Sequence, residues 1–194
     1  CSIFLLTLRK GSDRSFLTRI LYRLPVSLPG VPSCPDCSVI LVSLDTLRAD
    51  NLPCYGYQRN TAPGLCRFAE MNSFFSNFYS QSSYTLDSHM SIFTGLYPST
   101  HKVLFPRSDT LSPNIPTLTQ TLAANGYRTI YAGITNDPTL PLNKGLERGF
   151  QEIYTIDSFG DGWISGYQRL LPKLADNRPT FLFLHTYWVH APYS

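Results

Sequence analysis

The chain has 194 residues, enough for one domain with a core of its own. Hydrophobic residues make up 43% of the chain and charged residues 15%, a balance that excludes wholesale disorder. The net charge is +3 and no basic stripe is interleaved with aromatic residues, so no nucleic-acid partner is predicted.

The first 36 residues differ in character from the rest. Ile3–Leu8 is apolar and basic residues follow it, which fits the end of a membrane anchor or signal segment and equally a piece of buried helix. It is far shorter than the ~20 apolar residues of a membrane span, so membrane association is expected only through a missing N-terminal segment. Phe16–Leu24 predicts a short basic amphipathic helix, and the prolines from Pro25 to Pro35 predict an extended linker.

Cys34 and Cys37 have the CxxC spacing of a redox pair or of half a zinc site. No second CxxC follows and a proline-rich linker surrounds the pair, which favours no special function for it. The five cysteines are an odd number, so they assign no redox compartment. We expect residues 1–36 to be a linker or the end of an N-terminal segment, and a domain to start near Cys37.

From Cys37 onward, strand-like and helix-like segments alternate. Val39–Leu44, Arg128–Ala132 and Phe181–His185 predict strands buried on both faces, and the aromatic run Phe74–Tyr79 predicts a further short strand. Helices are predicted at about residues 61–71, 86–94, 116–125 and 162–174. This alternation predicts an α/β fold with a mostly parallel central sheet, helices on both faces, and the three buried strands as neighbours.

The segment Ser82–Pro98 places hydroxyl residues at the start of a short amphipathic helix. Thr85 is expected to be the N-cap of this helix, and Gly95 to end it. Free N–H groups and the positive end of the dipole suit an anion such as phosphate or sulfate, which a hydroxyl there could attack. An ordinary capped helix explains the same residues.

Polar side chains follow three of the predicted strands. Asp45 follows the first, and Thr135, Asn136 and Asp137 follow the second. The last ends at His185, with His190 shortly after. Ligands of open parallel sheets bind beyond the carboxyl ends of the strands, so these side chains and Thr85 are expected to converge at one edge. A mixture of carboxylate, hydroxyl, amide and imidazole groups suits a divalent cation and an oxyanion. The oxygens of Asp45 and Thr85 should lie roughly 3–5 Å apart if they share an ion.

Each of these residues also has an ordinary structural explanation. Asp45 could cap the following turn, and His185 could be a core histidine. Asn136-Asp137-Pro138 is good turn chemistry, and Arg48 and Asp50 could form a surface ion pair worth little energy. It is the coincidence of polar residues at corresponding strand ends that favours a site.

Five ordered segments resemble the sulfatase family of the alkaline phosphatase superfamily. They are Val39–Asp50 with Cys54–Tyr57 after it, Thr85–Tyr97, Leu122–Ala132, Gly145–Phe150 and Pro179–Tyr193. The resemblance covers about residues 38–194. It implies that residues 37–194 are the N-terminal part of an alkaline-phosphatase-like catalytic domain, truncated because its C-terminal part is missing. The implied function is metal-dependent hydrolysis of small-molecule or polymeric sulfate or phosphate esters, in an extracytoplasmic or membrane-associated location.

The resemblance assigns the metal and the nucleophile position by position. Asp45 matches the first metal-binding aspartate of the family, and Thr46 stands where many members have a second one. Thr85 matches the nucleophile and is expected to touch the ion as well. The implied ion is Ca, Mg or Mn. The family's remaining metal ligands are expected beyond Ser194, so the fragment itself is expected to be inactive.

The resemblance also assigns the substrate contacts. His190 matches a histidine that helps to bind the sulfate or phosphate group in this family, and we expect it to take part in catalysis. His89, Asn136 and His185 are expected to contact the substrate. Ile134 and Asn136 stand where the family usually has Lys-x-His, which is a departure from the pattern.

The nucleophile segment departs further from the family. Sulfatases proper carry Cys or Ser in Cys-x-Pro-Ser-Arg and oxidise that residue to formylglycine, whereas this chain has Thr85-Leu-Asp87-Ser-His89. Threonine cannot give that aldehyde. A threonine nucleophile is similar to the phosphotransferase branches, such as phosphoethanolamine transferases and lipoteichoic acid synthases. Two alternatives therefore stay open: a phosphotransferase, and a non-catalytic sulfatase-like binding module.

Overall fold

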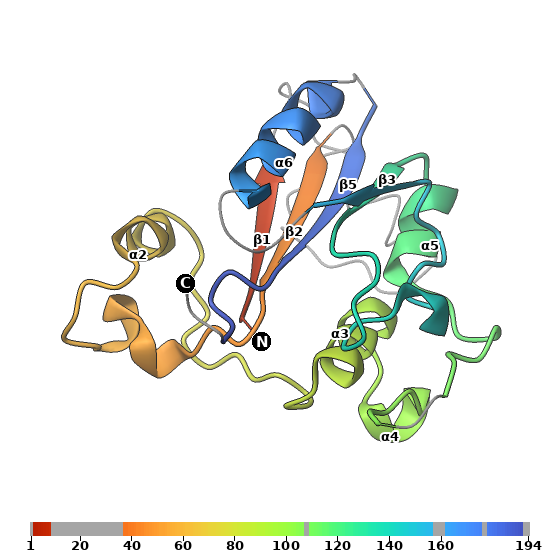
Figure 1. Cartoon of the computed structure of the whole chain (residues 1–194), viewed down its shortest axis with the longest axis horizontal. Helices are drawn as coiled ribbons and strands as arrows, with labels where there is room; N and C mark the ends of the chain where they lie inside the picture. Colours follow the sequence, from red (N-terminus) through yellow and green to blue (C-terminus); the bar gives the residue numbers. More distant parts are fainter. Residues whose placement is uncertain (1, 9–36, 107–108, 157–161, 176–177, 192–194) are drawn as a thin grey trace, which may run out of the picture.

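A computed structural model describes residues 2–8, 37–106, 109–156, 162–175 and 178–191. At its centre lies a five-stranded sheet in the order β1-β2-β5-β3-β4 (Figure 1). The strands are β1 Ser2–Leu8, β2 Ser38–Leu44, β3 Arg128–Gly133, β4 Glu152–Thr155 and β5 Thr180–Thr186. β2, β5, β3 and β4 pair in parallel, which confirms the predicted α/β class and the adjacency of the three buried strands.

The outermost strand β1 departs from the prediction. Ile3–Leu8, expected in an anchor or a buried helix, lies in β1 and pairs antiparallel with β2, with Ser2 opposite Leu44. A short apolar run is compatible with strand and helix alike, so the available pairing partner decides its structure. The predicted helix Phe16–Leu24, the proline linker and Cys34 lie outside the described residues.

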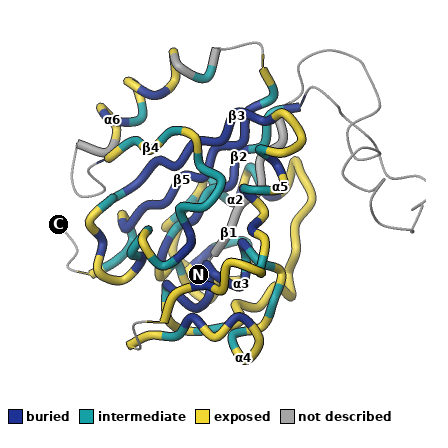
Figure 2. The backbone as a smooth tube through the Cα atoms, turned by 90° about the vertical axis from the view of Figure 1, so that its right-hand side faces the viewer, coloured by how far each residue is buried: buried dark blue, intermediate teal, exposed yellow. Residues whose placement is uncertain are grey.

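Helices cover both faces of the sheet, as the alternating pattern predicts. One face packs against α3 (Thr85–Thr94) and α5 (Leu118–Ala124), in a core that contains Met90 and Phe183. The other face packs against α6 (Gly162–Leu170), in a core that contains Leu170 and Leu184. Figure 2 shows the central strands β3 and β5 buried along their whole length, next to β2, where buried and partly buried residues are mixed.

The predicted helices form, with ends set by local capping. α5 begins after Thr117, which forms a reciprocal capping box with Gln120, and Gly126 follows the helix with a φ of 87°. The remaining short elements are α2 Pro63–Glu70, α4 Pro98–His101, and the 3₁₀ turns η1 Ala49–Asn51, η2 Pro53–Tyr55, η3 Leu142–Lys144 and η4 Leu171–Ala175. In the described part of the chain, no helix combines the length and apolar character needed to cross a membrane.

Phe74–Tyr79, predicted as a short strand, is an irregular exposed segment. Phe75 and Tyr79 are 70% and 75% exposed. Ser76 and Asn77 form a turn in the middle of the run, and both residue types favour turns over strands. The aromatic content alone is therefore a misleading signal here.

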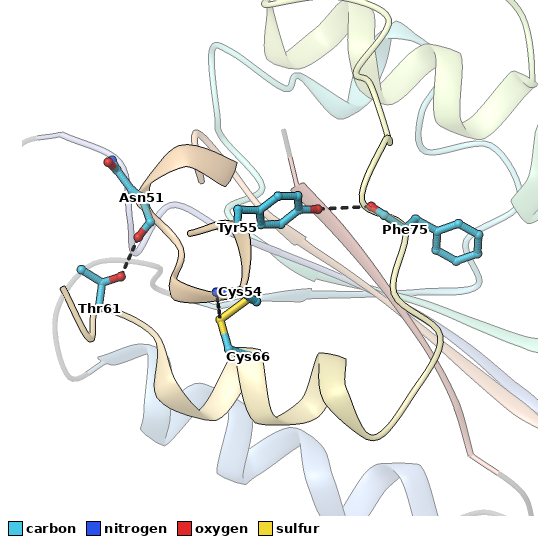
Figure 3. The surroundings of a disulfide bond; sticks show 6 residues. All are labelled: Asn51, Cys54, Tyr55, Thr61, Cys66 and Phe75. Atoms are coloured by element: carbon cyan, nitrogen blue, oxygen red, sulfur yellow. Dashed lines mark hydrogen bonds between the residues drawn. A yellow bond between two sulfur atoms is a disulfide. The ribbon is translucent and has the colours of Figure 1, made fainter. Parts of the chain in front are cut away.

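A disulfide organises the excursion that the chain makes between β2 and α3 (Figure 3). Cys54 in η2 is bonded to Cys66 in α2, twelve positions later. The Tyr55 hydroxyl donates to the Phe75 carbonyl over 3.2 Å, which ties the aromatic segment to η2. The excursion ends at the first residue of α3, so it leads directly into the site region.

Candidate functional site

Asp45 and Thr85 meet at the carboxyl edge of the sheet. Leu44 pairs with Thr186, and the N–H of Asp45 donates to the Thr186 carbonyl over 3.0 Å, so the ends of β2 and β5 lie level. The Thr85 hydroxyl donates to Asp45 Oδ2 over 2.9 Å, at the short end of the expected separation. Asp45 is 3% exposed and Thr85 is half-buried, so the pair is open to a ligand through Thr85.

Thr85 is not the N-cap of α3, contrary to the prediction. The N-cap is Tyr84, whose side chain makes no capping hydrogen bond, and Thr85 is the first helical residue. Gly95 ends the helix in the left-handed conformation with a φ of 69°, as predicted. The start of α3 therefore carries a hydroxyl that is bonded to a carboxylate on the neighbouring strand instead of to its own helix.

His89, predicted to contact the substrate, is completely buried one turn into α3. Its Nδ1 donates to the Thr85 carbonyl over 2.7 Å, which leaves Nε2 to accept from the Ser43 hydroxyl over 2.9 Å. Burial lowers the pKa of His89, so the ring is neutral at pH 7. This environment corrects the expectation, because His89 lies beneath Thr85 and anchors the helix rather than facing a ligand.

His185 lies inside the same edge and is 1% exposed. Its ring packs edge-on against His89 and Tyr187, with centroid separations of 4.9 and 4.7 Å. Burial, with a smaller contribution from His89, lowers the pKa of His185 well below its ordinary value. Such a position fits the alternative of a core histidine better than direct contact with a substrate.

Asn136 and Asp137, the two polar residues that follow one another after β3, differ in burial. Asn136, predicted to bind substrate, is exposed, whereas Asp137 is 5% exposed. Asp137 accepts hydrogen bonds from the Thr139 N–H over 2.7 Å and from the Tyr187 hydroxyl. Burial, reinforced by Asp137, raises the pKa of Tyr187. Asp137 therefore joins the end of β3 to the segment that follows β5.

His190 lies in a half-buried turn after β5. The backbone N–H of His190 donates to the Tyr187 carbonyl over 2.8 Å. The centroids of the His190 and Tyr187 rings lie 5.3 Å apart. Thr46 donates its hydroxyl to the Val189 carbonyl over 3.1 Å, from a φ of 59° that β-branched residues rarely adopt. This bond holds the His190 segment next to Asp45, so we assign Thr46 this tethering contact in place of the predicted metal contact.

Arg48 and Asp50 form a surface ion pair, one of the structures that the sequence allows. Arg48 Nε donates to Asp50 Oδ1 over 2.9 Å, and the two side chains are 69% and 63% exposed. The Arg48 guanidinium lowers the pKa of Asp50. An ion pair so exposed contributes little to stability. This agrees with the ordinary structural explanation of these two residues as a surface ion pair.

Ser43 and Tyr187 belong to this region without having been predicted, whereas Asp137 stands among the polar residues expected after β3. The sequence does contain a signal for Ser43, because it is a polar residue in an apolar run. It also stands two positions before Asp45, so the two side chains point to the same side of the chain at the end of β2. The contact between Asp137 and Tyr187 spans 50 positions and joins the segments that follow β3 and β5. No local pattern points to a pair of that kind.

The donors at this edge suit a hard divalent cation in kind but not in number. Asp45 and Thr85 offer a carboxylate and a hydroxyl oxygen, the ligand type that Mg, Mn and Ca prefer. Among the described residues, no group of three or more His, Cys, Asp or Glu side chains could hold a metal ion. Asp45 and Thr85 would therefore hold an ion only together with further ligands.

Sequence comparison matches most of the chain to a known family. The model of the sulfatase family matches residues 38–194. Arylsulfatase A of Homo sapiens is 31% identical over 131 residues, which cover 63% of this chain and 24% of that protein. The chain thus spans about a quarter of the length of this curated relative.

Solved structures share the fold at lower sequence identity. The phosphonate monoester hydrolase of Agrobacterium radiobacter superposes with a TM-score of 0.62 at 19% identity, over 79% of this chain and 41% of that chain. The soluble domain of lipooligosaccharide phosphoethanolamine transferase A from Neisseria meningitidis superposes with a TM-score of 0.52 at 18% identity, over 79% of this chain and 45% of that chain. The architecture is therefore alkaline-phosphatase-like. Because the family model matches most of its length, the chain belongs to the sulfatase family.

Proposed function

We propose that the protein hydrolyses phosphate or sulfate esters, with phosphate esters preferred, and that Thr85 is its covalent nucleophile. The observation that carries this proposal is the contact between the Thr85 hydroxyl and Asp45 Oδ2 at the carboxyl edge of the sheet. A threonine hydroxyl is a weak nucleophile and needs a base or a metal to activate it. Because threonine cannot be converted to formylglycine, Thr85 cannot attack a sulfate ester in the way that the formylglycine of sulfatases proper does.

Two displacements at Thr85 account for hydrolysis. In the first, Thr85 Oγ attacks phosphorus or sulfur, the bond from that atom to the ester oxygen breaks, and the hydroxyl proton passes to Asp45 Oδ2. The alcohol leaves with the electron pair and takes a proton from water. In the second, water attacks the phospho- or sulfo-threonine and gives one proton to the hydroxide left by the first step, the bond to Oγ breaks, and Oγ regains its proton from Asp45. His190 binds the oxyanion throughout.

A divalent ion, Mg, Mn or Ca, is part of the proposal because both Asp45 and Thr85 present oxygen donors. Bound there, it would stabilise the alkoxide form of Thr85 and polarise the ester. Asp45 fixes the direction of the Thr85 hydroxyl through the 2.9 Å hydrogen bond. The remaining ligands belong to parts of the protein outside the described residues.

A phosphotransferase is the second candidate. It differs only in the second displacement, where an acceptor alcohol replaces water. A threonine at the nucleophile position favours it, and so does the structural likeness to a phosphoethanolamine transferase domain. The third alternative is a non-catalytic binding module. It is supported by Ile134 and Asn136, which stand where the family usually has Lys-x-His.

The substrate is expected to be a small or polymeric ester handled outside the cytoplasm. The disulfide between Cys54 and Cys66 supports an oxidising compartment, where such bonds form and persist. Membrane association through an N-terminal segment stays a prediction.

The test is turnover of aryl phosphate and aryl sulfate by the full-length protein with Mn, Mg or Ca added. Thr85→Ala should lower kcat by about 1,000-fold or more, because the covalent path is lost. Thr85→Ser should keep measurable activity, since its hydroxyl remains. Thr94→Ala is the matched control, because it removes a hydroxyl from the far end of α3 that donates to the Met90 carbonyl.

The outcomes separate the candidates. Loss of turnover in Thr85→Ala alone supports the covalent mechanism, and release of product only when an acceptor alcohol is added identifies the transferase. Wild-type turnover by Thr85→Ala would make Thr85 a structural residue. A wild-type protein that binds the esters without turning them over would favour the binding module.

A further inference from the structure

Two parallel side-chain links join β2 to the first turn of α3. Asp45 and Thr85 form one link, and Ser43 and His89 form the other, each with a heavy-atom distance of 2.9 Å. The partners stand two positions apart on the strand and four positions apart on the helix. The first link carries the proposed nucleophile, and the second lies in the completely buried layer beneath it.

The spacing of the two links matches because of regular backbone geometry. Two residues of a strand advance by about 6.6 Å. Four residues of an α-helix advance by about 6 Å and return to the same face. Side chains at Ser43 and Asp45 can therefore engage His89 and Thr85 at the same time, with helix and strand running side by side. The pair of links fixes both the position of α3 along β2 and its rotation.

His89 also reaches the nucleophile directly. Its Nδ1 donates to the carbonyl of Thr85 itself over 2.7 Å, and its Nε2 accepts from Ser43. His185 packs edge-on against the ring at 4.9 Å. The imidazole thus connects the backbone of Thr85 to β2 and is restrained on a further side, which leaves little freedom for the first turn of α3.

We propose that Ser43 and His89 are positioning residues, which hold Thr85 Oγ at the distance and direction needed to engage Asp45 and to attack the ester. The proposal rests on the function proposed for Thr85. It assigns no contact with the substrate to either residue. Its effect is on the rate of the covalent step, because small displacements of a nucleophile are costly to rate and cost much less in binding.

The same helix carries a matched link that serves as a control. Ser91 Oγ and His101 Nε2 lie 3.1 Å apart, and both residues are buried. This link joins α3 to α4 at a position two residues after His89 and more than one helical turn after Thr85. Ser43→Ala and Ser91→Ala therefore each remove a buried serine hydroxyl from a histidine Nε2, and Ser91→Ala also removes a hydrogen bond from Ser91 to the Asp87 carbonyl. Only in Ser43→Ala does the histidine hold the nucleophile.

The experiment compares these variants in the full-length protein by kinetics with aryl phosphate, thermal unfolding and crystallography. Ser43→Ala should lower kcat by about 10- to 100-fold and change KM by less than about twofold. Its Thr85 Oγ to Asp45 Oδ2 distance should lengthen beyond hydrogen-bond range from 2.9 Å. Ser91→Ala should show a similar loss of thermal stability with kcat and this distance unchanged.

A second substitution tests the link from its other end. His89→Asn keeps an amide N–H near the Thr85 carbonyl and loses the reach to Ser43. It should resemble Ser43→Ala, and the double variant should be no slower than the slower single variant, because both changes break one link.

Equal kcat losses in Ser43→Ala and Ser91→Ala, or an unchanged Thr85–Asp45 distance in Ser43→Ala, would overturn the positioning role. A wild-type protein without turnover would instead refute the proposed function, and the Thr85–Asp45 distance would then decide the positioning role alone.

Discussion

A hydroxyl at the first residue of a helix has two possible partners, the N–H groups of its own helix and whatever lies beyond the helix end. The Thr85 hydroxyl bonds to a partner beyond the helix end, the Asp45 carboxylate 2.9 Å away, because a charged acceptor makes a stronger hydrogen bond than a neutral one. The helix is then left with Tyr84 as an N-cap that supplies no side-chain bond. A cap is worth ~1 kcal/mol, which a bond to a largely buried carboxylate can offset.

Tyr187 provides a prediction at the same scale. Its hydroxyl donates to Asp137, and its ring packs against His185 and His190. Tyr187→Phe keeps the ring and deprives a nearly buried carboxylate of a donor. We expect it to lower the free energy of unfolding by about 1.5 to 3 kcal/mol, the range for hydrogen bonds to charged groups.

Tyr131→Phe is the control for this prediction, measured by chemical denaturation alongside it. The Tyr131 hydroxyl donates to the Ile134 carbonyl over 3.0 Å, which is a neutral acceptor. The expected loss is therefore smaller, about 0.5 to 1.5 kcal/mol. A loss in Tyr187→Phe no larger than in Tyr131→Phe would show that the bond to Asp137 contributes no more than an ordinary one.

The contact between Asp45 and Thr85 could be predicted from sequence because their positions along the chain determine their positions in space. Asp45 directly follows a buried strand and Thr85 opens a helix, so their convergence follows from the rule for parallel sheets. His89 and His185 were placed at the edge but not at the right depth. Depth depends on which neighbours cover a side chain, and those neighbours come from distant parts of the chain.

At the scale of elements, the edge strand β4 is tied to β3 by charge. Arg128 Nη2 donates to Glu152 Oε2 over 2.8 Å, and the two side chains are 9% and 30% exposed. The Tyr154 hydroxyl donates to the same carboxylate over 2.6 Å. The Arg128 guanidinium, helped by Tyr154, lowers the pKa of Glu152 to about 2.

This shift predicts how stability depends on pH. The folded pKa of Glu152, about 2, lies below the unfolded value of 4.5. The stabilisation is therefore complete above pH 4.5 and is lost as the pH falls toward 2. With allowance for partial exposure, the pair should contribute about 1 to 3 kcal/mol at neutral pH.

The measurement is the difference in unfolding free energy between wild type and Glu152→Gln as a function of pH. It should be largest at neutral pH and shrink between pH 4.5 and the acid limit of the folded state. Glu70→Gln removes an exposed carboxylate at the end of α2 and should show no such trend. A difference independent of pH would contradict the assigned pKa shift.

Element prediction worked where apolar runs alternate with predicted helices and failed where that context is missing. Val39–Leu44 and Phe181–His185 are neighbouring strands, as expected, because such alternation is typical of a parallel sheet. Ile3–Leu8 was open between several structures, and its pairing with β2 settled the choice. Phe74–Tyr79 has the aromatic residues typical of strands, but Ser76 and Asn77 in its middle form a turn, so no strand forms there.

On the scale of the whole molecule, the layered sheet is held by apolar burial and the excursion between β2 and α3 is held by a few specific bonds. Figure 2 shows how exposed much of that excursion is compared with the central strands. Cys54–Cys66 closes its first half, and the Thr61 hydroxyl donates to the Asn51 carbonyl over 2.6 Å within the same loop (Figure 3). The excursion ends at Thr85, so its order bears on the site.

The double substitution Cys54→Ser/Cys66→Ser should therefore loosen the excursion before it affects the sheet. Opening a disulfide loop of this size costs about 3 kcal/mol on the chain-entropy account. Limited proteolysis of the full-length protein without reductant should give cleavage between residues 49 and 84 in the variant. The strands β2, β3 and β5 should stay protected, because they are buried in the common core.

Thr61→Val is the control for this last prediction, since it removes one hydrogen bond from the same loop and leaves the disulfide in place. A single neutral hydrogen bond contributes about 1 kcal/mol, so cleavage should increase much less than in the double variant. Equal protease resistance of the wild type and the double variant would show that Tyr55, through its bond to the Phe75 carbonyl, and the packing of α2 hold the excursion without the disulfide. Cleavage that begins in the sheet would mean that the excursion and the sheet unfold as one unit.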